Sequence, residues 1–261
     1  MSRQGFALLA VLWVITALTA LTGAGMLVAR LGSDTTRNRI LLARAEWARE
    51  ACGEILQARF AADATVRSLH AIDLGRGTWC RASVDDPSAM INLNTADRDV
   101  LVRLSGAIRV DPTLADSVIA VRHRGPIYEA RQAPGIDSAL ATRLSQYVTT
   151  RGSGVINVNA ALPEVLRTLP GATEEAVFVL MGRRTQRAVQ SADELAGALS
   201  RSARAIFLNN YAEFVRTAVF APPQLIGTLE GGVMGTPIVA RATLTMVPVP
   251  GRLAVIRRET E

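Results

Sequence analysis

The sequence predicts an α+β fold, in which a long N-terminal helix packs on an antiparallel sheet and an all-helical insertion of two repeated units interrupts the strands. Three observations predict it. An uncharged apolar stretch, residues 6–29, leads directly into an amphipathic helical pattern. Apolar and polar residues alternate with the period of a strand near residue 80 and again near the C-terminus. An internal repeat with helical periodicity lies between these two regions.

The apolar stretch from Phe6 to Ala29 is long enough to cross a membrane. It holds no charged residue, and about 24 residues at 1.5 Å per residue exceed a hydrocarbon core of roughly 30 Å. Its Leu, Ile, Val and Phe side chains favour insertion. Three interpretations are open at this point: a cleaved secretory signal ending near Thr22-Gly23-Ala24, a plain membrane anchor, or a transmembrane helix behind a processed leader of residues 1–5.

The same helix is predicted to continue beyond the apolar stretch to about Ala62. Apolar side chains recur at spacings of four, three, four and three residues, which places them on one face of a helix. They are Leu41, Ala45, Ala48, Cys52 and Ile55. Most of the charged residues in this region, Arg49 among them, fall off this face. A single helix from residue 6 to about residue 62 would be roughly 85 Å long.

Residues 75–84 alternate as a half-buried strand does, and Cys80 lies on the side predicted to cover the helix. Because Cys52 lies on the inward face of that helix, the two residues are candidates for one disulfide. Two separate buried thiols are the alternative. A disulfide would fit an oxidising compartment such as the periplasm. Neither cysteine belongs to a set with metal-ligand spacing.

The middle of the chain contains an internal repeat at an offset of 65 residues. Ile91–Gly106 (INLNTADRDVLVRLSG) aligns with Ile156–Gly171 (INVNAALPEVLRTLPG), and eight of the sixteen pairs are identical. In each copy Asn side chains are predicted to cap a short helix that the final Gly ends. Further helix starts are predicted where capping residues precede apolar runs. These starts are Asp111-Pro112, Gly135-Ile136-Asp137, Thr173-Glu174-Glu175 and Ser191–Glu194.

Strand periodicity returns after about residue 207. Three late strands are predicted, at Tyr211–Phe220, Ile238–Met246 and Leu253–Arg257. With the early strand they would form an antiparallel sheet against the long helix. The predicted organisation is a leader at 1–5, a transmembrane helix at 6–29, a helix and first strand at 30–88, a helical insertion at 89–206 with repeats near 91–150 and 156–205, and C-terminal strands at 207–261.

The N-terminus resembles the processing site of type IV pilin-like precursors. In that family a membrane-bound prepilin peptidase cuts after a Gly and methylates the amino group of the following Phe, which correspond here to Gly5 and Phe6. Most members carry Glu as the fifth residue of the mature chain, whereas this chain has Ala10. This departure, together with an insertion that opens on Asn-Leu-Asn-Thr at residues 92–95, resembles the K-type minor pseudopilins of type II secretion systems.

This resemblance implies a subunit at the tip of the pseudopilus that initiates or caps its assembly and supports protein export across the outer membrane. The implied partners are other minor pseudopilins in a heterotrimeric tip complex, the prepilin peptidase and the inner-membrane secretion platform. The implied location is the inner membrane, crossed once, with the N-terminus in the cytoplasm and the body in the periplasm. The Arg residues that follow the apolar stretch would give the opposite orientation, but the prepilin-like leader outweighs them.

The repeats also resemble helix-hairpin-helix units, so the alternative function is a membrane-anchored DNA receptor of the uptake type. DNA-binding hairpins of that kind have a second Gly that lets the backbone approach a phosphate. This Gly is absent from the three matching triplets, at residues 106–108, 135–137 and 171–173. The net charge of +6 is weak evidence for nucleic acid, because all 29 basic residues are Arg, as a GC-rich coding sequence would give.

Catalytic motifs are absent from the sequence. It has two His residues, His70 and His123, and no P-loop, His-Glu-x-x-His or Gly-x-Ser-x-Gly pattern. The pair Asp85-Asp86 is expected to be a solvated strand end rather than a general acid and base. No cofactor is expected; calcium on a few carboxylates is the one that the composition leaves open, although no EF-hand loop is present. We therefore expect a structural protein and not an enzyme.

Overall fold

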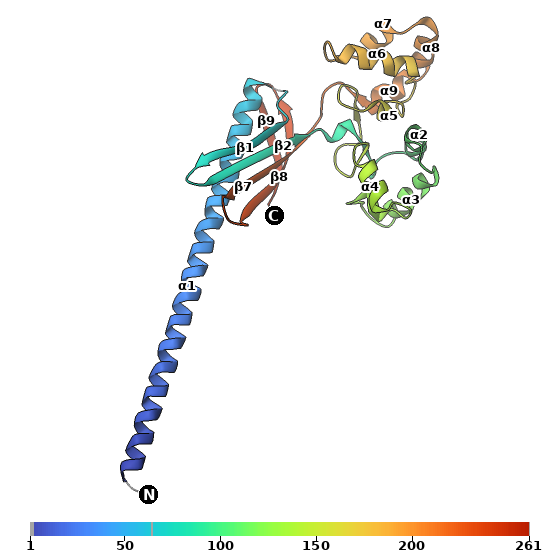
Figure 1. The fold of residues 1–261 in the computed structure, drawn as a ribbon. Coiled ribbons are helices and arrows are strands. Elements are labelled where there is room, and N and C mark those ends of the chain that lie inside the picture. The colour runs from blue at the N-terminus through green and yellow to red at the C-terminus, as the bar shows by residue number, and fades with distance from the viewer. Residues whose placement is uncertain (1–2, 64, 261) are drawn as a thin grey trace.

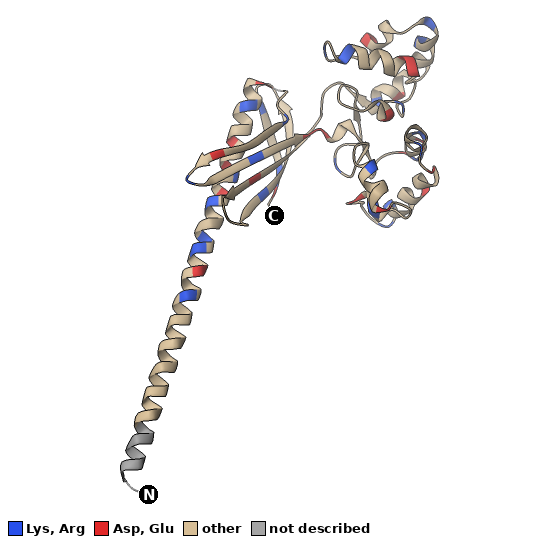
Figure 2. Ribbon diagram, viewed as in Figure 1, with Lys and Arg blue, Asp and Glu red and all other residues tan. Residues whose placement is uncertain are grey.

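A single helix, α1 (Arg3–Ala62), forms the axis of the molecule in the computed structural model, which describes residues 3–63 and 65–260, with side chains from residue 11 onward. Its 60 residues give a length of about 90 Å. The N-terminal part projects alone, and the C-terminal part lies against a sheet (Figure 1). Among the described side chains, the charged residues of α1 begin only at Arg30 (Figure 2). The predicted uninterrupted helix is confirmed, since neither Gly32 nor Gly53 breaks it.

Five antiparallel strands form one sheet against α1. Their order is β1-β2-β7-β8-β9. They are β1 (Ser68–Gly75), β2 (Thr78–Asp85), β7 (Leu225–Val233), β8 (Val239–Val249) and β9 (Arg252–Thr260). The helix contacts β2, β7, β8 and β9, so it covers one face of the sheet (Figure 1). The predicted α+β class, a long helix on an antiparallel sheet, is confirmed.

The helix and the sheet share a core made from one helix stripe and from alternate strand residues. The predicted stripe is confirmed from Ala45 to Cys52. It continues with Leu56, four residues further on the same face, in place of the half-buried Ile55. The buried side chains that the strands contribute include Cys80, Ala82, Val84, Leu229, Leu244 and Met246.

The close approach of α1 to β7 depends on Gly231. A Cβ atom at this position would lie 2.2 Å from the amide nitrogen of Arg49 and 2.4 Å from the carbonyl oxygen of Ala45. The helix backbone therefore rests directly on the strand backbone. Arg49, which the periodicity places off the buried face, is buried at this contact. Its guanidinium donates to the Arg241 carbonyl in β8 and to the Glu50 carboxylate.

Two of the strand predictions need correction. Residues 75–84 include a turn, because β1 and β2 form a hairpin whose tip, residues 75–77, has positive φ angles. The strand predicted at Tyr211–Phe220 is wrong: this segment forms helix α9 (Tyr211–Thr217) and the two-residue strand β6 (Ala218–Val219). The ring of Phe214 packs on that of Phe207, with 4.7 Å between their centroids. This contact fixes a helix in a segment whose apolar residues fit either period.

The helical insertion leaves and re-enters the sheet between neighbouring strands. Asp85 in β2 pairs with Ile226 in β7, so the intervening chain forms a body joined to the sheet at one place (Figure 1). The body contains two units, each closed by a two-residue parallel pair. β3 (Ile91–Asn92) pairs with β4 (Val148–Thr149), and β5 (Ile156–Asn157) pairs with β6. The helices end at residue 217 and the second unit at residue 219, beyond the predicted ends at 206 and 205.

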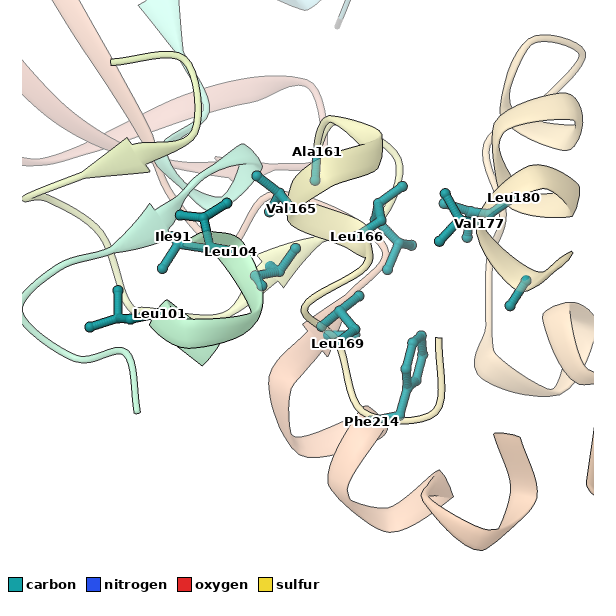
Figure 3. Packing of buried hydrophobic residues seen from close by; sticks show 14 of the residues in the cluster. Ile91, Leu101, Leu104, Ala161, Val165, Leu166, Leu169, Val177, Leu180 and Phe214 are labelled. Atoms are coloured by element: carbon teal, nitrogen blue, oxygen red, sulfur yellow. The ribbon is translucent and has the colours of Figure 1, made fainter. Parts of the chain in front are cut away.

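Residues that recur in the repeat form one continuous core through both units (Figure 3). The first unit contains α2 (Arg98–Ile108), α3 (Thr113–Arg122), the 3-10 turn η2 (Ala130–Gln132) and α4 (Ser138–Leu144), and a second such turn, η1 (Pro87–Ala89), precedes it. The second unit contains α5 (Pro163–Leu166), α6 (Glu174–Arg184), α7 (Ala192–Ala198), α8 (Arg201–Asn209) and α9. Recurring residues that are buried in both copies include Ile91 and Ile156, Leu101 and Leu166, and Leu104 and Leu169.

Candidate functional site

The part of α1 that projects from the body is apolar and uncovered. Each of its large apolar side chains from Val11 to Leu31 is more than half exposed. By length and composition this helix can cross a membrane, with a mean hydropathy of 2.0 in its most apolar window. The hydroxyls of Thr16, Thr19 and Thr22 donate to carbonyls one turn earlier in the helix. No hydroxyl of these three residues would therefore enter hydrocarbon without a partner.

Three of the predicted functional residues lie at the start of this helix. Gly5, Phe6 and Ala10 belong to α1, but their side chains lie outside the described residues. Cleavage between Gly5 and Phe6, methylation of Phe6 and a tip-specific role of Ala10 therefore stay predictions.

Cys52 and Cys80 meet between the helix and the sheet. Both are fully buried and both are free thiols, and each thiol affects the pKa of the other. Burial raises the pKa of both thiols above the ordinary value. The fold therefore brings together the two cysteines that the sequence predicts to meet. Whether they are bridged in the cell stays a prediction.

We expect neither thiol to react with a maleimide in the folded protein. Both are excluded from solvent, and a raised pKa removes the reactive thiolate at neutral pH. Labelling of the full-length protein in mild detergent, followed by mass spectrometry, measures this. A Ser202→Cys variant, exposed on α8, is the control and should label at least about tenfold faster. Rapid labelling of Cys52 or Cys80 before unfolding would contradict the burial. A second experiment labels the unfolded protein with and without reductant: two free thiols label in both samples, whereas a disulfide labels only after reduction.

The Asn residues of the repeat fasten each unit together instead of capping helices. In the second unit the Asn159 side chain donates to the carbonyls of Val189 and Phe220, each at 2.8 Å, and accepts from the Val189 N–H at 2.9 Å. In the first unit Asn94 makes the same three bonds, to the carbonyls of Ile127 and Thr150 and from the Ile127 N–H. The predicted caps are wrong, because α2 and α5 begin without a side-chain cap.

An Arg residue in each unit also holds distant parts of that unit together. Arg122 donates to the carbonyls of Leu93 and Ala96 in the first unit. In the second unit Arg184 donates to the corresponding carbonyls, of Val158 and Ala161. These Arg residues lie at the C-terminal ends of α3 and α6, and they tie each helix to the loop that opens its unit. In both Arg residues one guanidinium nitrogen is held by these two carbonyls.

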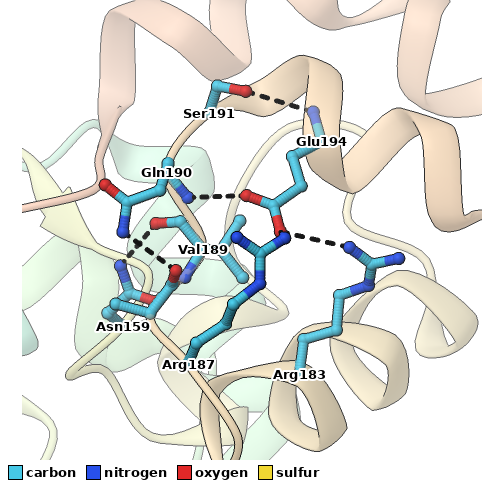
Figure 4. A network of polar contacts seen from close by, with 8 residues as sticks. Asn159, Arg183, Arg187, Val189, Gln190, Ser191 and Glu194 are labelled. Atoms are coloured by element: carbon cyan, nitrogen blue, oxygen red, sulfur yellow. Dashed lines mark hydrogen bonds and ion pairs between the residues drawn. The ribbon is translucent and has the colours of Figure 1, made fainter.

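A polar network joins the loop after α6 to the start of α7 (Figure 4). The Glu194 carboxylate accepts from the Gln190 N–H at 2.9 Å and pairs with Arg187 and Arg183 at 2.8 and 3.1 Å. These contacts lower the pKa of Glu194, the backbone hydrogen bond first. Their stabilising contribution is therefore present at neutral pH and is lost as the pH falls through this lowered pKa. Ser191 accepts from the Glu194 N–H, as its predicted capping position requires.

At two of the hairpins a side chain caps one of the amides that could bind phosphate. At the start of α4 the Asp137 side chain accepts from the Leu140 N–H at 2.7 Å, and at the start of α6 Thr173 accepts from the Ala176 N–H at 3.2 Å. These are first-turn amides of the kind that bind phosphate in DNA-binding hairpins. The third triplet, residues 106–108, lies within α2. This helix ends at Ile108, before Arg109 (φ 56°), and not at the predicted Gly106.

The remaining titratable candidates are structural or solvent-exposed. Asp86 is half-buried and accepts from the Ser88 N–H and the Asn157 amide, at 2.9 and 2.7 Å. Asp86 therefore ties the chain segment that enters the insertion to the second unit. Asp85 is exposed, as expected. His70 is exposed in β1 of the sheet, and His123 is exposed after α3 in the first unit. Within the described parts of the chain, no group of three or more His, Cys, Asp or Glu side chains is placed to hold a metal ion; calcium binding stays a prediction.

Comparison of the sequence with protein-family models and with curated proteins gives no match. Among solved structures, the chain is similar to one chain of the GspK-GspI-GspJ complex from the type 2 secretion system of enterotoxigenic Escherichia coli. The TM-score is 0.59 at 12 % identity, and the similarity covers 89 % of this chain and 99 % of that chain. At this identity the similarity establishes the fold. That fold has the elements that the sequence predicts: a long N-terminal helix, an antiparallel sheet and a helical insertion.

We expect Asn159→Ala to destabilise the insertion by about 2–4 kcal/mol. It removes three hydrogen bonds and leaves the Val189 and Phe220 backbone groups without their partner. Thermal unfolding of the full-length protein in detergent, followed by circular dichroism, measures the loss. Asn94→Ala should give a similar loss, since its bonds are the same. Asn209→Ala, at an exposed position on α8, should change the stability by less than about 0.5 kcal/mol. Equal stability of Asn159→Ala and Asn209→Ala would contradict the fastening role.

Proposed function

We propose that this chain is a minor pseudopilin of the K type that stands at the tip of a type II secretion pseudopilus. The observation that carries the proposal is the architecture: one helix with a bare apolar half, a sheet on its other half, and a helical body inserted between β2 and β7. The match to a chain of a secretion complex over almost its whole length supports it. The chain would be a structural subunit without catalytic activity.

The mature protein would begin at Phe6, methylated on its amino group after cleavage by the prepilin peptidase. It would cross the inner membrane once, with its N-terminus in the cytoplasm and its body in the periplasm. There it would join other minor pseudopilins in a heterotrimeric tip complex and contact the inner-membrane platform. Ala10 and the bulk of the insertion would together prevent another subunit from docking above it, which supports a role in initiating or capping the pseudopilus during protein export.

Intact-mass measurement of the protein extracted from membranes tests this proposal. The expected mass is that of a chain from Phe6 to Glu261 with one added methyl group. A chain that begins at Met1 would indicate a plain anchor, and one that begins near Gly25 would indicate a secretory signal; either result contradicts the proposal. The alternative of a DNA receptor is not favoured, because the hairpin amides at Leu140 and Ala176 already have partners.

We expect Ala10→Glu to leave secretion unchanged or mildly reduced. A tip subunit has no neighbour ahead of it to offer an amino terminus, so the new carboxylate finds no partner. An unpaired carboxylate in the apolar segment is unfavourable by at most about 2.5–3.5 kcal/mol, and protonation lessens this. Secretion of a reporter exoprotein measures the effect. Longer pseudopili that contain this subunit along the shaft would show instead that the absent charge had acted as the cap.

A further inference from the structure

The first unit of the insertion has an open groove between η2, α4 and β4. Its volume is about 630 Å³. Buried and half-buried apolar side chains, such as Val148 and Met90, form its floor. Its rim carries the ring of Tyr128, which is 72 % exposed, and the guanidinium groups of Arg131 and Arg151. Aromatic residues and Arg are enriched at protein–protein interfaces, and the rim of the groove has both.

The repeat shows which part of the second unit corresponds to this groove. Ile127 and Val189 are equivalent, because each exchanges the same hydrogen bonds with the Asn of its unit. Counting on from them, Arg131 in η2 corresponds to Asp193 in α7. Asp137 and Ser200 are equivalent too, because each caps the helix that follows. The helix α4 therefore corresponds to α8.

The second unit fills the corresponding position with its own chain. Val148 follows the cap Asp137 by 11 residues, whereas Ala218 follows the cap Ser200 by 18. The difference of seven residues is the length of α9.

Tyr211, the first residue of α9, bridges the helices that correspond to the walls of the groove. Its ring packs edge-on against Phe207 of α8, 6.1 Å between centroids, and its hydroxyl donates to Asp193 of α7 at 2.7 Å. Phe207 corresponds to Leu144 of α4 by the same count from the caps. The first unit has no α9. Arg131, at the position of Asp193, lines the groove, whereas Leu144, at the position of Phe207, is buried beside it.

We propose that the groove of the first unit binds a short segment of a partner protein that carries an aromatic side chain next to a carboxylate. The aromatic ring would occupy the position that Tyr211 holds in the second unit. In the second unit the Tyr211 hydroxyl donates to the negatively charged Asp193. In the first unit the positively charged Arg131 stands at that position, so the ligand would carry a carboxylate there. Arg151 adds a second positive charge on the same rim, and no described residue forms an ion pair with it. The ion pair of Arg131 with Glu129 is exposed on both sides, so a ligand carboxylate can compete for it.

This inference does not depend on the proposed function, because it concerns a surface of the body and not membrane assembly. The test uses full-length protein in detergent micelles and a fluorescent peptide with the sequence of residues 210–217, NYAEFVRT, which carries Tyr and Phe on either side of a Glu. Fluorescence anisotropy should show saturable binding. Arg131→Glu should weaken it at least about tenfold by charge reversal, and Thr142→Trp should do the same by filling the groove that Thr142 lines.

Arg124→Glu is the matched control, since Arg124 is exposed in the same unit but does not line the groove. It changes the net charge equally and should leave the affinity within about twofold. Unfolding temperatures of the variants confirm that all are folded. Three results would overturn the proposal: no saturable binding at millimolar peptide, equal weakening by Arg124→Glu, or self-association of the protein that Thr142→Trp abolishes and the peptide does not compete with. The last result would assign the groove to a second copy of this chain.

Discussion

The Gly5→Val protein is expected to keep its leader and to reduce secretion to background. On the proposed function, the peptidase must attack the carbonyl of Gly5, and the two γ-methyl groups of a β-branched side chain at that position would obstruct the approach. The uncut chain would keep residues 1–5, including the charged Arg3, ahead of the apolar segment. Its amino terminus would then be that of Met1, whereas on the proposed function assembly requires the amino terminus at Phe6.

Two measurements on the same cells check this expectation. Intact mass reports whether the leader is present, and export of a reporter exoprotein reports function. Gly25→Val is the matched control: it makes the same chemical change inside the apolar segment, at a site where an added Cβ meets no atom within 4 Å. It should be processed and should support secretion. Normal secretion by an unprocessed Gly5→Val protein would refute the pseudopilin proposal as a whole.

The parts of the fold that were predictable are those with a strong local signal. The uncharged stretch and the stripe from Ala45 to Cys52 define α1 because a helix repeats its faces every three or four residues. The strand period is just as clear in β8. Capping residues such as Asp137 and Thr173 mark helix starts correctly, since a cap acts on amides within three residues.

The parts that were missed depend on contacts between distant segments. The strand β7 was not predicted, because it has Gly at positions 227, 231 and 232 and so lacks side chains that would show the alternation. These Gly residues leave room for Met246, for the backbone of α1 and for Trp79, respectively. Asn159 looks like a cap from its neighbours alone, yet its partners Val189 and Phe220 lie 30 and 61 residues away. The groove of the first unit is recognisable only once α9 is known to be a helix that the first unit lacks.

Gly231→Ala is expected to destabilise the helix–sheet domain by about 3 kcal/mol, which for a separately unfolding domain of about 100 residues lowers its unfolding temperature by roughly 12–24 °C. The added Cβ would lie 2.2, 2.4 and 2.8 Å from backbone atoms of Arg49, Ala45 and Ala48. Backbone atoms within a helix cannot turn away as the end of a side chain can, so α1 must move off β7 as a unit. Such a movement would separate the buried contacts that Ala45, Ala48 and Cys52 make with the sheet.

Tryptophan fluorescence reports the unfolding of the helix–sheet domain in detergent, because all three Trp residues lie in α1 or β2. The ring of Trp79 lies against Gly232, next to this contact. Gly53→Ala is the matched control, because Gly53 lies in the same helix and an added Cβ meets only the end of the Leu229 side chain, at 3.4 Å. Alanine favours a helix interior over glycine by up to about 1 kcal/mol, so this variant should be as stable as the parent or slightly more so. The insertion, joined to the sheet at one place, should unfold at the parent's temperature in both variants. If Gly231→Ala and Gly53→Ala unfold together, α1 does not rest on the backbone of β7.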